Sequence, residues 1–238
     1  MMKKLYDIID CNYDIDIKGI KTNSKEIQPG DLFVCVKGVN VDRHDFINEA
    51  VANGAVALIT DRDVEASVPY VKVISPDEEL RKMVVKFYDN PLDELVLIGI
   101  TGTDGKTSTA TIVQTLIGDN QCGFIGTTGI RCKNLNKETS NTTLPFEKLV
   151  ENFREFINCG CKYVVMEVSS EAIFYDRVNG INYNAVAFTT ITSDHLNTHK
   201  TLENYVSCKK QLFRQTKKDG FCILNKDSNY YDDFLFHL

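Results

Sequence analysis

The strongest indication of the fold of this chain is the stretch LVLIGITGTDGKTST, residues 95–109. An apolar run of strand length enters a loop that contains glycines, and a helix-forming sequence begins at Lys106. A loop that ends a strand and opens a helix directs backbone N–H groups and the positive end of the helix towards an anion. The stretch therefore predicts a phosphate site in which Lys106 reaches the β and γ phosphates and the Thr107 hydroxyl binds magnesium.

The glycines of this loop differ from the usual arrangement. A standard phosphate loop reads G-x-x-x-x-G-K-[ST], and Ile100 stands where its first glycine belongs. Gly102 can make the turn instead, because glycine accepts backbone angles that other residues avoid. The alternative is an ordinary strand-to-helix turn with a solvated lysine, since G-K-[ST] alone also arises by chance. The expected nucleotide-binding residues are Gly102, Thr103, Asp104, Gly105, Lys106, Thr107 and Ser108.

Strands and helices continue to alternate after the loop. Apolar runs of strand length occupy 123–129, 162–168, 184–190 and 220–225, and helical patterns cover about 145–158 and 201–218. Residues 131–143 form a polar stretch. Nearly continuous apolar strands separated by helices indicate a parallel sheet that is covered on both faces. We therefore predict an α/β domain of the P-loop ATPase type.

Residues 1–90 show the same alternation on a smaller scale. The strand-length run VALIT, 56–60, follows a helical pattern at 44–55, which again indicates α/β structure. The segment DNPLDE, 89–94, then interrupts the pattern. The sequence thus predicts a small N-terminal α/β domain, 1–92, followed by the parallel-sheet domain, 93–238.

The composition argues against several classes of protein. The 238 residues carry a formal net charge of -6 and a pI near 5.3, whereas a general nucleic-acid or anionic-membrane binder needs a positive field. The N-terminus lacks the apolar core of a signal peptide, and the longest aliphatic runs are too short to span a bilayer. Eight cysteines without a C-x-x-C pair favour reduced, buried thiols. We expect a cytoplasmic monomer that binds neither nucleic acid nor membranes.

Two polar residues follow predicted strands at the end where ligands gather in an open α/β sheet. Glu167 lies near the end of the strand 162–168, where an ionised carboxylate is costly unless it is paired or binds a cation. A buried glutamate capped by backbone N–H groups is the alternative. His195 follows the strand 184–190 and can bind metal there. His199 lies four residues later, but no third ligand at zinc spacing follows, so we interpret it as structural or close to substrate.

Of the two adjacent lysines 209 and 210, only one can face inward from the predicted helix. The apolar stripe of this helix consists of Leu202, Tyr205, Val206, Leu212 and Phe213. Position 209 falls on the stripe, and position 210 is turned about 100° away from it. Lys209 is therefore the inward lysine, and burial favours the neutral amine that reacts with carbon dioxide. Taken alone, the pattern favours a lysine that extends its charged end to solvent.

Several stretches, in order, resemble the Mur ligases, which join amino acids to the peptidoglycan precursor. IGITGTDGKTST, 98–109, resembles their loop G-x-T-G-T-[ND]-G-K-T-[ST], and TNSKEIQPGDLFVCVKG, 22–38, resembles the opening of MurE-type enzymes, the UDP-N-acetylmuramoyl-tripeptide synthetases. The later blocks are FIGTTG, NTTLP, VVMEVSSEAI, TTITSDHLNTHKTLENYVSCKKQLF and LNKDS. Glu171 stands where the family normally has histidine, and Tyr175 replaces a glutamine.

The resemblance implies an ATP-dependent amide ligase that adds the third amino acid to UDP-MurNAc-dipeptide through an acyl phosphate. ATP and Mg²⁺ would be its cofactors, and UDP-MurNAc-dipeptide and a free amino acid its substrates. The first domain would bind the UDP-muropeptide and the second ATP. The family's third domain, which binds the amino acid, is not in this sequence, and the second domain ends soon after its fifth strand. We therefore expect a fragment or truncated relative that binds its ligands without turnover.

The resemblance also assigns residues. Glu167 and His195 would bind magnesium with Thr107, and a carbamylated Lys209 would hold a second magnesium ion; with Lys106 these form the expected catalytic set. The implied substrate-binding residues are Ser24 at the uridine end and Asn141, Thr142, Thr143, Ser170 and Arg177 near the carboxylate.

Two other functions stay open. One is a related ligase such as a folylpolyglutamate synthetase, against which the opening at 22–38 argues because that enzyme lacks the uridine-binding domain. The other is a non-catalytic nucleotide-binding partner, which would not need Glu167, His195 and Lys209.

Overall fold

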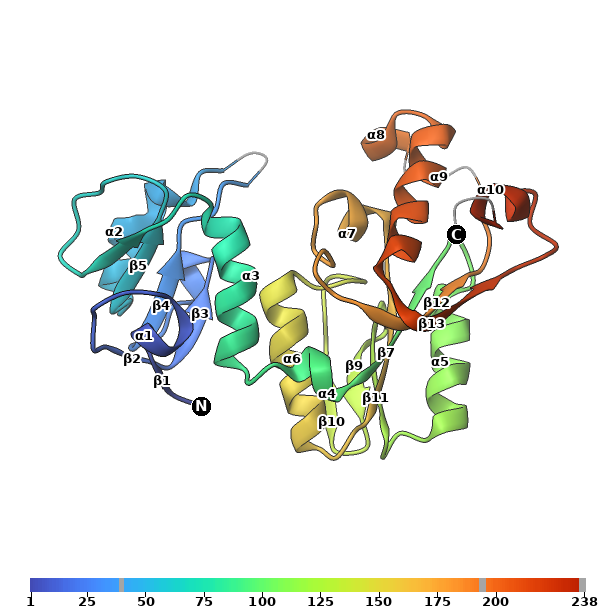
Figure 1. Cartoon of the computed structure of the whole chain (residues 1–238), viewed down its shortest axis with the longest axis horizontal. Coiled ribbons are helices and arrows are strands. Elements are labelled where there is room, and N and C mark those ends of the chain that lie inside the picture. The colour runs from blue at the N-terminus through green and yellow to red at the C-terminus, as the bar shows by residue number, and fades with distance from the viewer. Residues whose placement is uncertain (39–40, 193–195, 236–238) are drawn as a thin grey trace. The chain divides into compact units, whose positions relative to one another are not determined.

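The computed structural model describes residues 1–38, 41–192 and 196–235. The chain divides into two compact units, Met1–Asn90 and Pro91–Leu238, and each unit has its own parallel strands (Figure 1). None of the helices in the described ranges is long and apolar enough to cross a membrane.

The first unit is built on a four-stranded parallel sheet. Its order is β3 (Gly19–Lys21), β4 (Asp31–Val34), β5 (Ala57–Thr60) and β6 (Tyr70–Lys72). Every residue of β4 and β5 is buried, which explains their short apolar sequences. The remaining elements are β1 (Lys3–Lys4), paired antiparallel with β2 (Asp16–Ile17), the helices α1 (Leu5–Ile8), α2 (Ile47–Ala52) and α3 (Pro76–Phe87), and the 3₁₀ turns η1 (Ser24–Glu26) and η2 (Arg43–Phe46).

Helix α3 illustrates how local sequence specifies an element. Ser75 caps it by accepting a hydrogen bond from the N–H of Glu78 at 3.3 Å, and Pro76 occupies the first helical position. Leu80, Met83, Val84 and Phe87 recur at helical spacing and are all buried. Helix α3 is therefore amphipathic, and it packs against α1 and β4.

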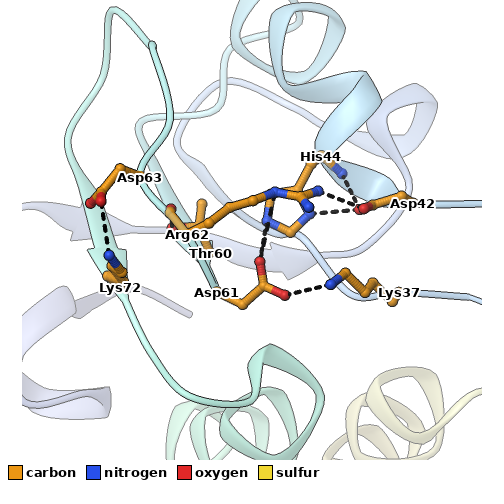
Figure 2. Close-up of polar contacts among 8 residues, drawn as sticks. All are labelled: Lys37, Asp42, His44, Thr60, Asp61, Arg62, Asp63 and Lys72. Atoms are coloured by element: carbon orange, nitrogen blue, oxygen red, sulfur yellow. Dashed lines mark hydrogen bonds and ion pairs between the residues drawn. The ribbon is translucent and has the colours of Figure 1, made fainter.

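A charged cluster joins the end of β5 to the start of η2 in the first unit (Figure 2). Asp42 accepts hydrogen bonds from the backbone N–H and ring Nδ1 of His44, at 3.0 and 2.6 Å, and from Arg62 at 2.5 Å. On its other side His44 Nε2 lies 3.3 Å from Asp61, which also pairs with Lys37 at 2.9 Å. These contacts tie together segments that are about twenty residues apart.

The second unit contains a seven-stranded sheet in the order β10-β9-β8-β11-β7-β12-β13. Its strands are β7 (Val96–Thr101), β8 (Cys122–Gly126), β9 (Gly129–Cys132), β10 (Leu135–Lys137), β11 (Tyr163–Glu167), β12 (Tyr183–Phe188) and β13 (Thr216–Leu224). The five strands from β8 to β13 in spatial order run parallel, as predicted.

Helices cover both faces of this sheet (Figure 1). Cys122 and Phe124 of β8 pack in the cluster that contains Ala110 of α5 (Lys106–Ile117), whereas the intervening Gly123 faces Phe156 of α6 (Phe146–Asn158). Successive strand residues point to opposite faces, so α5 and α6 lie on opposite sides. The other helical segments are α4 (Pro91–Glu94), α7 (Ser170–Phe174), α8 (Leu196–His199), α9 (Leu202–Gln211), η3 (Leu212–Gln215) and α10 (Tyr231–Leu235).

Two features differ from the sequence prediction. The polar stretch 131–143 contains antiparallel strand structure, because β9 and β10 extend the sheet from β8 as successive hairpins. An edge hairpin pairs through its backbone and does not need a continuous apolar sequence. The last predicted helix is also shorter than expected, since α9 and η3 end at Gln215 and β13 begins at Thr216.

Candidate functional site

The glycine loop, residues 102–105, connects β7 to α5. Gly102 has φ 150° and Gly105 has φ 82°, conformations that favour glycine. A Cβ atom at Gly102 would lie 1.9 Å from Oγ1 of Thr189, so this position also has no room for a side chain. Gly102 thus makes the turn that the missing glycine at position 100 would otherwise make.

The segment that follows β12 holds this loop in place. The N–H of Thr103 donates to the carbonyl of Thr190 at 2.7 Å, and the Thr189 hydroxyl donates to the carbonyl of Asp104 at 2.6 Å. The loop is therefore fixed at the carboxyl ends of two adjacent parallel strands, which is where ligands bind in open α/β sheets.

Two lysines from different helices meet at the carbonyl of Gly102. Lys106 Nζ, from the first turn of α5, donates to this carbonyl at 3.0 Å and to that of Thr103 at 2.7 Å. Lys209 Nζ, from α9, donates to the same Gly102 carbonyl at 2.9 Å and lies 4.5 Å from the centre of the Tyr205 ring. Lys209 is 1% exposed, whereas Lys210 pairs with Asp233 at 3.2 Å. The prediction that the Lys209 side chain faces the interior is confirmed.

Glu167 ends β11 directly beside Ile100 of β7 in the sheet register. Its carboxylate is buried and accepts hydrogen bonds from the Thr107 hydroxyl at 2.8 Å and from the N–H of Thr127 at 2.9 Å. The Thr127 hydroxyl lies 3.4 Å from the same carboxylate. A Cβ atom at Gly126 would lie 2.1 Å from Glu167 Oε1, so a glycine at the end of β8 leaves the space that the carboxylate occupies.

Lys106, Thr107, Thr127 and Glu167 share one pocket of about 440 Å³, whereas Gly102 and Lys209 are not among its described lining residues. The lining residues are Thr103, Asp104, Gly105, Lys106, Thr107, Ser108, Thr127, Ser140, Asn141, Thr142, Thr143, Glu167, Ser169, Glu171 and Arg177. The pocket therefore combines the start of a helix, two cations and three carboxylates within polar walls. Such a site suits a phosphorylated ligand together with a divalent cation.

Two protein-family models match this chain, and together they cover most of both units. The Mur ligase middle domain matches residues 100–237, and the model described as Mur ligase family, catalytic domain, matches residues 16–88. The chain belongs to the Mur ligase family. Together the two matches include both the glycine loop and the 22–38 opening, so the resemblance in the sequence is confirmed.

Similar Mur ligases include two UDP-N-acetylmuramoyl-L-alanyl-D-glutamate–2,6-diaminopimelate ligases. The protein from Bacillus cereus is 35% identical over 98% of this chain and 50% of its own length. The protein from Bacillus licheniformis is 40% identical over 85% of this chain and 42% of its own length. The chain thus spans about half the length of the curated relatives it matches.

Solved structures of Mur ligases share the fold. The structure of a UDP-N-acetylmuramoyl-L-alanyl-D-glutamate–2,6-diaminopimelate ligase matches with a TM-score of 0.76 and 23% identity, over 100% of this chain and 50% of that chain. MurF ligase from Thermotoga maritima, solved in complex with ADP, matches with a TM-score of 0.60 and 23% identity, over 92% of this chain and 48% of that chain.

The residues that the Mur ligase resemblance assigned to substrate lie in different places. Asn141, Thr142, Thr143 and Arg177 line the pocket, and Arg177 donates to the Thr143 carbonyl at 3.2 Å. Ser170 is 1% exposed and is not among the lining residues that the structure describes; the neighbouring Ser169 lines the pocket.

Two further predicted residues cannot be placed in the pocket. Ser24 belongs to the first unit, is 2% exposed and donates its hydroxyl hydrogen to Glu49. His195 lies outside the described residues. His199 is 3% exposed, and its ring packs against Phe174 and Tyr205.

The donor set of the Mur ligase pocket fits magnesium. Among the described residues, no group of three or more His, Cys, Asp and Glu side chains is arranged to hold a metal. Magnesium, however, is commonly held by one or two carboxylates and completed by phosphates and water. The Glu167 carboxylate and the Thr107 hydroxyl, 2.8 Å apart, are oxygen donors of this kind.

Thr127 is the clearest pocket residue that the sequence prediction omitted. It lines the pocket, contacts Glu167 through both its N–H and its hydroxyl, and its hydroxyl lies 3.0 Å from that of Thr142. The signal was available, because Thr127 lies near the end of the predicted strand 123–129, as Glu167 lies near the end of the predicted strand 162–168.

Proposed function

We propose that this chain forms the nucleotide-binding and muropeptide-binding part of an ATP-dependent carboxylate–amine ligase. The observation that carries the proposal is one pocket lined by Lys106, Thr107 and Glu167, built where a phosphate-type loop joins a parallel strand to a helix. The names of the relatives supply the substrate class.

In the proposed reaction, the free carboxylate of UDP-MurNAc-L-Ala-D-Glu attacks the γ phosphorus of ATP, and ADP leaves. The amine of diaminopimelate then attacks the carbonyl carbon of the acyl phosphate and displaces phosphate, which forms the amide. The relatives named for this reaction are about twice as long as this chain. The complete reaction is therefore proposed for this chain together with the part of the relatives that it does not match.

Within that reaction, the pocket residues act by positioning and by neutralising charge. Residues 102–108 hold the phosphates through the loop and the start of α5, and Lys106 balances their charge. Arg177 faces the pocket from the segment after α7 and offers a guanidinium fork to the substrate carboxylate. Asn141, Thr142 and Thr143 line the same pocket, and Ser170, which follows the lining residue Ser169, is the remaining residue implied for this contact.

Thr107 and Glu167 are the proposed magnesium ligands in the described part of the pocket, with His195 as a further ligand. When bound, magnesium neutralises the charge that develops on the transferred phosphoryl group. We also propose that Lys209 is carbamylated, so that it supplies a second carboxylate; its burial beside the glycine loop supports this assignment.

The first unit is proposed to bind the uridine end of the muropeptide. Ser24 is the residue implied for this contact, and its hydroxyl oxygen can still accept a hydrogen bond while its hydrogen is donated to Glu49. Since Ser24 offers one hydroxyl and Arg177 offers a charged fork, Arg177→Ala should weaken muropeptide binding more than Ser24→Ala.

Calorimetry with a non-hydrolysable ATP analogue and magnesium tests the nucleotide assignment. Lys106→Ala should weaken binding about 10- to 100-fold, because it removes charge-assisted hydrogen bonds to phosphate. Lys218→Ala, at an exposed lysine of β13, is the matched control and should leave the affinity unchanged. Equal affinities for Lys106→Ala and the original chain would refute the phosphate loop.

Nuclear magnetic resonance with ¹³C-labelled bicarbonate tests the carbamate. A carbamate carbon signal should appear in the original chain and in Lys210→Ala, and it should be absent from Lys209→Ala. Identical spectra for all three proteins would remove the modification while leaving the nucleotide site intact.

A further inference from the structure

Arg131 lies outside every motif that the family resemblance uses, yet it makes an unusually complete set of contacts beside the pocket. It sits on β9 directly opposite Phe124 of β8, and its guanidinium carbon lies 3.6 Å from the centre of the Phe124 ring. Its Nε donates to Gln114 Oε1 at 3.1 Å, Nη2 to the Thr111 hydroxyl at 3.2 Å, and Nη1 to the Thr128 hydroxyl at 2.8 Å.

Two of these partners belong to the helix that begins at the phosphate loop. Thr111 and Gln114 follow Thr107 by four and seven residues, so the three side chains share one face of α5. Gln114 is 5% exposed and also donates to the carbonyls of Cys122 at 3.1 Å and Arg131 at 3.2 Å. The Arg131 side chain therefore sets where this face of α5 lies against β8 and β9.

The third partner belongs to the turn between β8 and β9. Thr128 follows Thr127, whose N–H donates to one oxygen of Glu167, while Thr107 of α5 donates to the other. The two groups that orient the Glu167 carboxylate thus come from the two elements that Arg131 joins. A displacement of either element would rotate or release the carboxylate.

We propose that Arg131 is a positioning residue that fixes the Glu167 carboxylate for magnesium-assisted nucleotide binding by clamping α5 to the β8–β9 turn. This inference rests on the proposed function. Charge contributes as well, since Arg131 and Glu167 interact electrostatically, and burial lowers the pKa of the guanidinium from its ordinary value. The guanidinium, however, donates from three nitrogens to three different residues, and the compact charge of a lysine cannot reproduce these three contacts.

The test measures binding of a non-hydrolysable ATP analogue to the 238-residue chain, with magnesium and with a chelator. Removing a group that orients a metal ligand typically costs about 10- to 100-fold in metal affinity. Arg131→Ala should therefore reduce the magnesium-dependent gain in affinity by about tenfold and leave the affinity in chelator nearly unchanged. Arg154→Ala is the matched control, because Arg154 also bridges two elements, pairing α6 with Glu94 at 2.6 Å, but on the opposite face of the sheet from α5.

A double-mutant cycle asks whether Arg131 acts through Glu167. In a Glu167→Gln background, Arg131→Ala should have little further effect on the magnesium-dependent gain. Additive losses would overturn the proposal, because they would mean that Arg131 acts by another route. Equal losses with and without magnesium would also overturn it, because general destabilisation of the pocket would explain them.

Two milder variants keep the test decisive if Arg131→Ala folds poorly. Arg131→Lys retains the charge but not the fork and should not restore the magnesium-dependent gain; full restoration would contradict the clamp. Thr111→Val removes one contact of the clamp and should reduce the gain by less than Arg131→Ala does; an unchanged gain would contradict the clamp. If the original chain binds the analogue without any magnesium dependence, the proposed function itself fails. If the original chain shows the magnesium-dependent gain in affinity and no Arg131 or Thr111 variant changes it, only the role of Arg131 fails.

Discussion

Glu167 in the second unit and Asp42 in the first unit each accept several hydrogen bonds, but from different kinds of donor. Asp42 is bound by His44 and by the Arg62 guanidinium, and its side chain is 29% exposed (Figure 2). Glu167 is 0% exposed and is bound by two threonine hydroxyls and one backbone N–H. Within the described ranges, no lysine or arginine forms an ion pair with Glu167.

The difference supports a structural role for the Asp42 cluster and the ligand-binding role proposed for Glu167. An ionised carboxylate removed from water is costly unless a cation or sufficient hydrogen bonds compensate it. The Arg62 guanidinium, a cation of the protein itself, pairs with Asp42. Glu167 lies in a pocket without such a pair in the described residues, as the proposed site for a metal and phosphates would.

Glu167→Gln should give the largest effect, and an unchanged nucleotide affinity would contradict the distinction between the two clusters. The amide keeps the shape of the side chain but not its charge, so the magnesium-dependent gain in nucleotide affinity should fall by at least about tenfold. The free energy of unfolding should not decrease, because the amide oxygen can accept from Thr127, the amide nitrogen can donate to Thr107, and no charge remains buried. Calorimetry and urea unfolding measure the two quantities. A large loss of stability with unchanged nucleotide binding would show that Glu167 stabilises the fold and does not take part in binding.

Asp42→Asn should show the reverse pattern with a smaller effect. It removes the charge that His44 and Arg62 contact, while the amide oxygen can still cap η2, so we expect a loss of about 1 kcal/mol in the stability of the first unit. Hydrogen exchange of the amides in residues 41–60 measures this loss locally. Nucleotide affinity should not change, and a parallel fall in affinity would contradict the separation of roles.

The effect of Asp42→Asn should depend on pH in a defined direction. Burial favours the neutral acid, but the hydrogen bonds from His44 and Arg62 outweigh it and hold the pKa of the Asp42 carboxyl well below its ordinary value of 3.8. A lowered pKa contributes stability above the unfolded value, and this contribution is lost as the pH falls through the folded value. The difference between the two proteins should therefore be full at pH 7 and shrink below about pH 3.8. A difference that grows in acid would contradict the ion-pair explanation.

Lys72→Ala should have the smallest effect, and it tests whether exposure distinguishes the ion pairs of the first unit. Lys72 pairs with Asp63 at 2.9 Å, but the two side chains are 52% and 78% exposed. Exposed pairs contribute little because solvent screens them. Hydrogen exchange in the first unit should not change measurably. A loss of stability as large as that of Asp42→Asn would show that solvent exposure does not distinguish the Lys72–Asp63 pair from the contacts of Asp42.

The sequence predicted much of the fold because its strongest signals are local. The apolar run before the loop, the glycines at 102 and 105 and the helix from Lys106 together specify a strand, a turn and a helix without reference to distant residues. The inward facing of Lys209 also followed from helical periodicity. The antiparallel pair β9–β10 was missed, because its residues lack a continuous apolar pattern and are held by pairing with β8.

The sequence alone was sufficient for the glycine loop between a strand and a helix, the α/β class, the family resemblance and the strand end that carries Glu167. The tertiary structure was needed to show which side chains meet at that strand end. Thr107, Thr127 and Glu167 are 20 to 60 residues apart in the chain, and their contact depends on the order β8-β11-β7 in the sheet. Arg131 is the extreme case, because a lone arginine in a polar stretch gives no signal until strand pairing places it opposite Phe124 and against α5. Local propensity acts over a few residues, whereas the geometry of a site is set by packing between elements that are distant in the sequence.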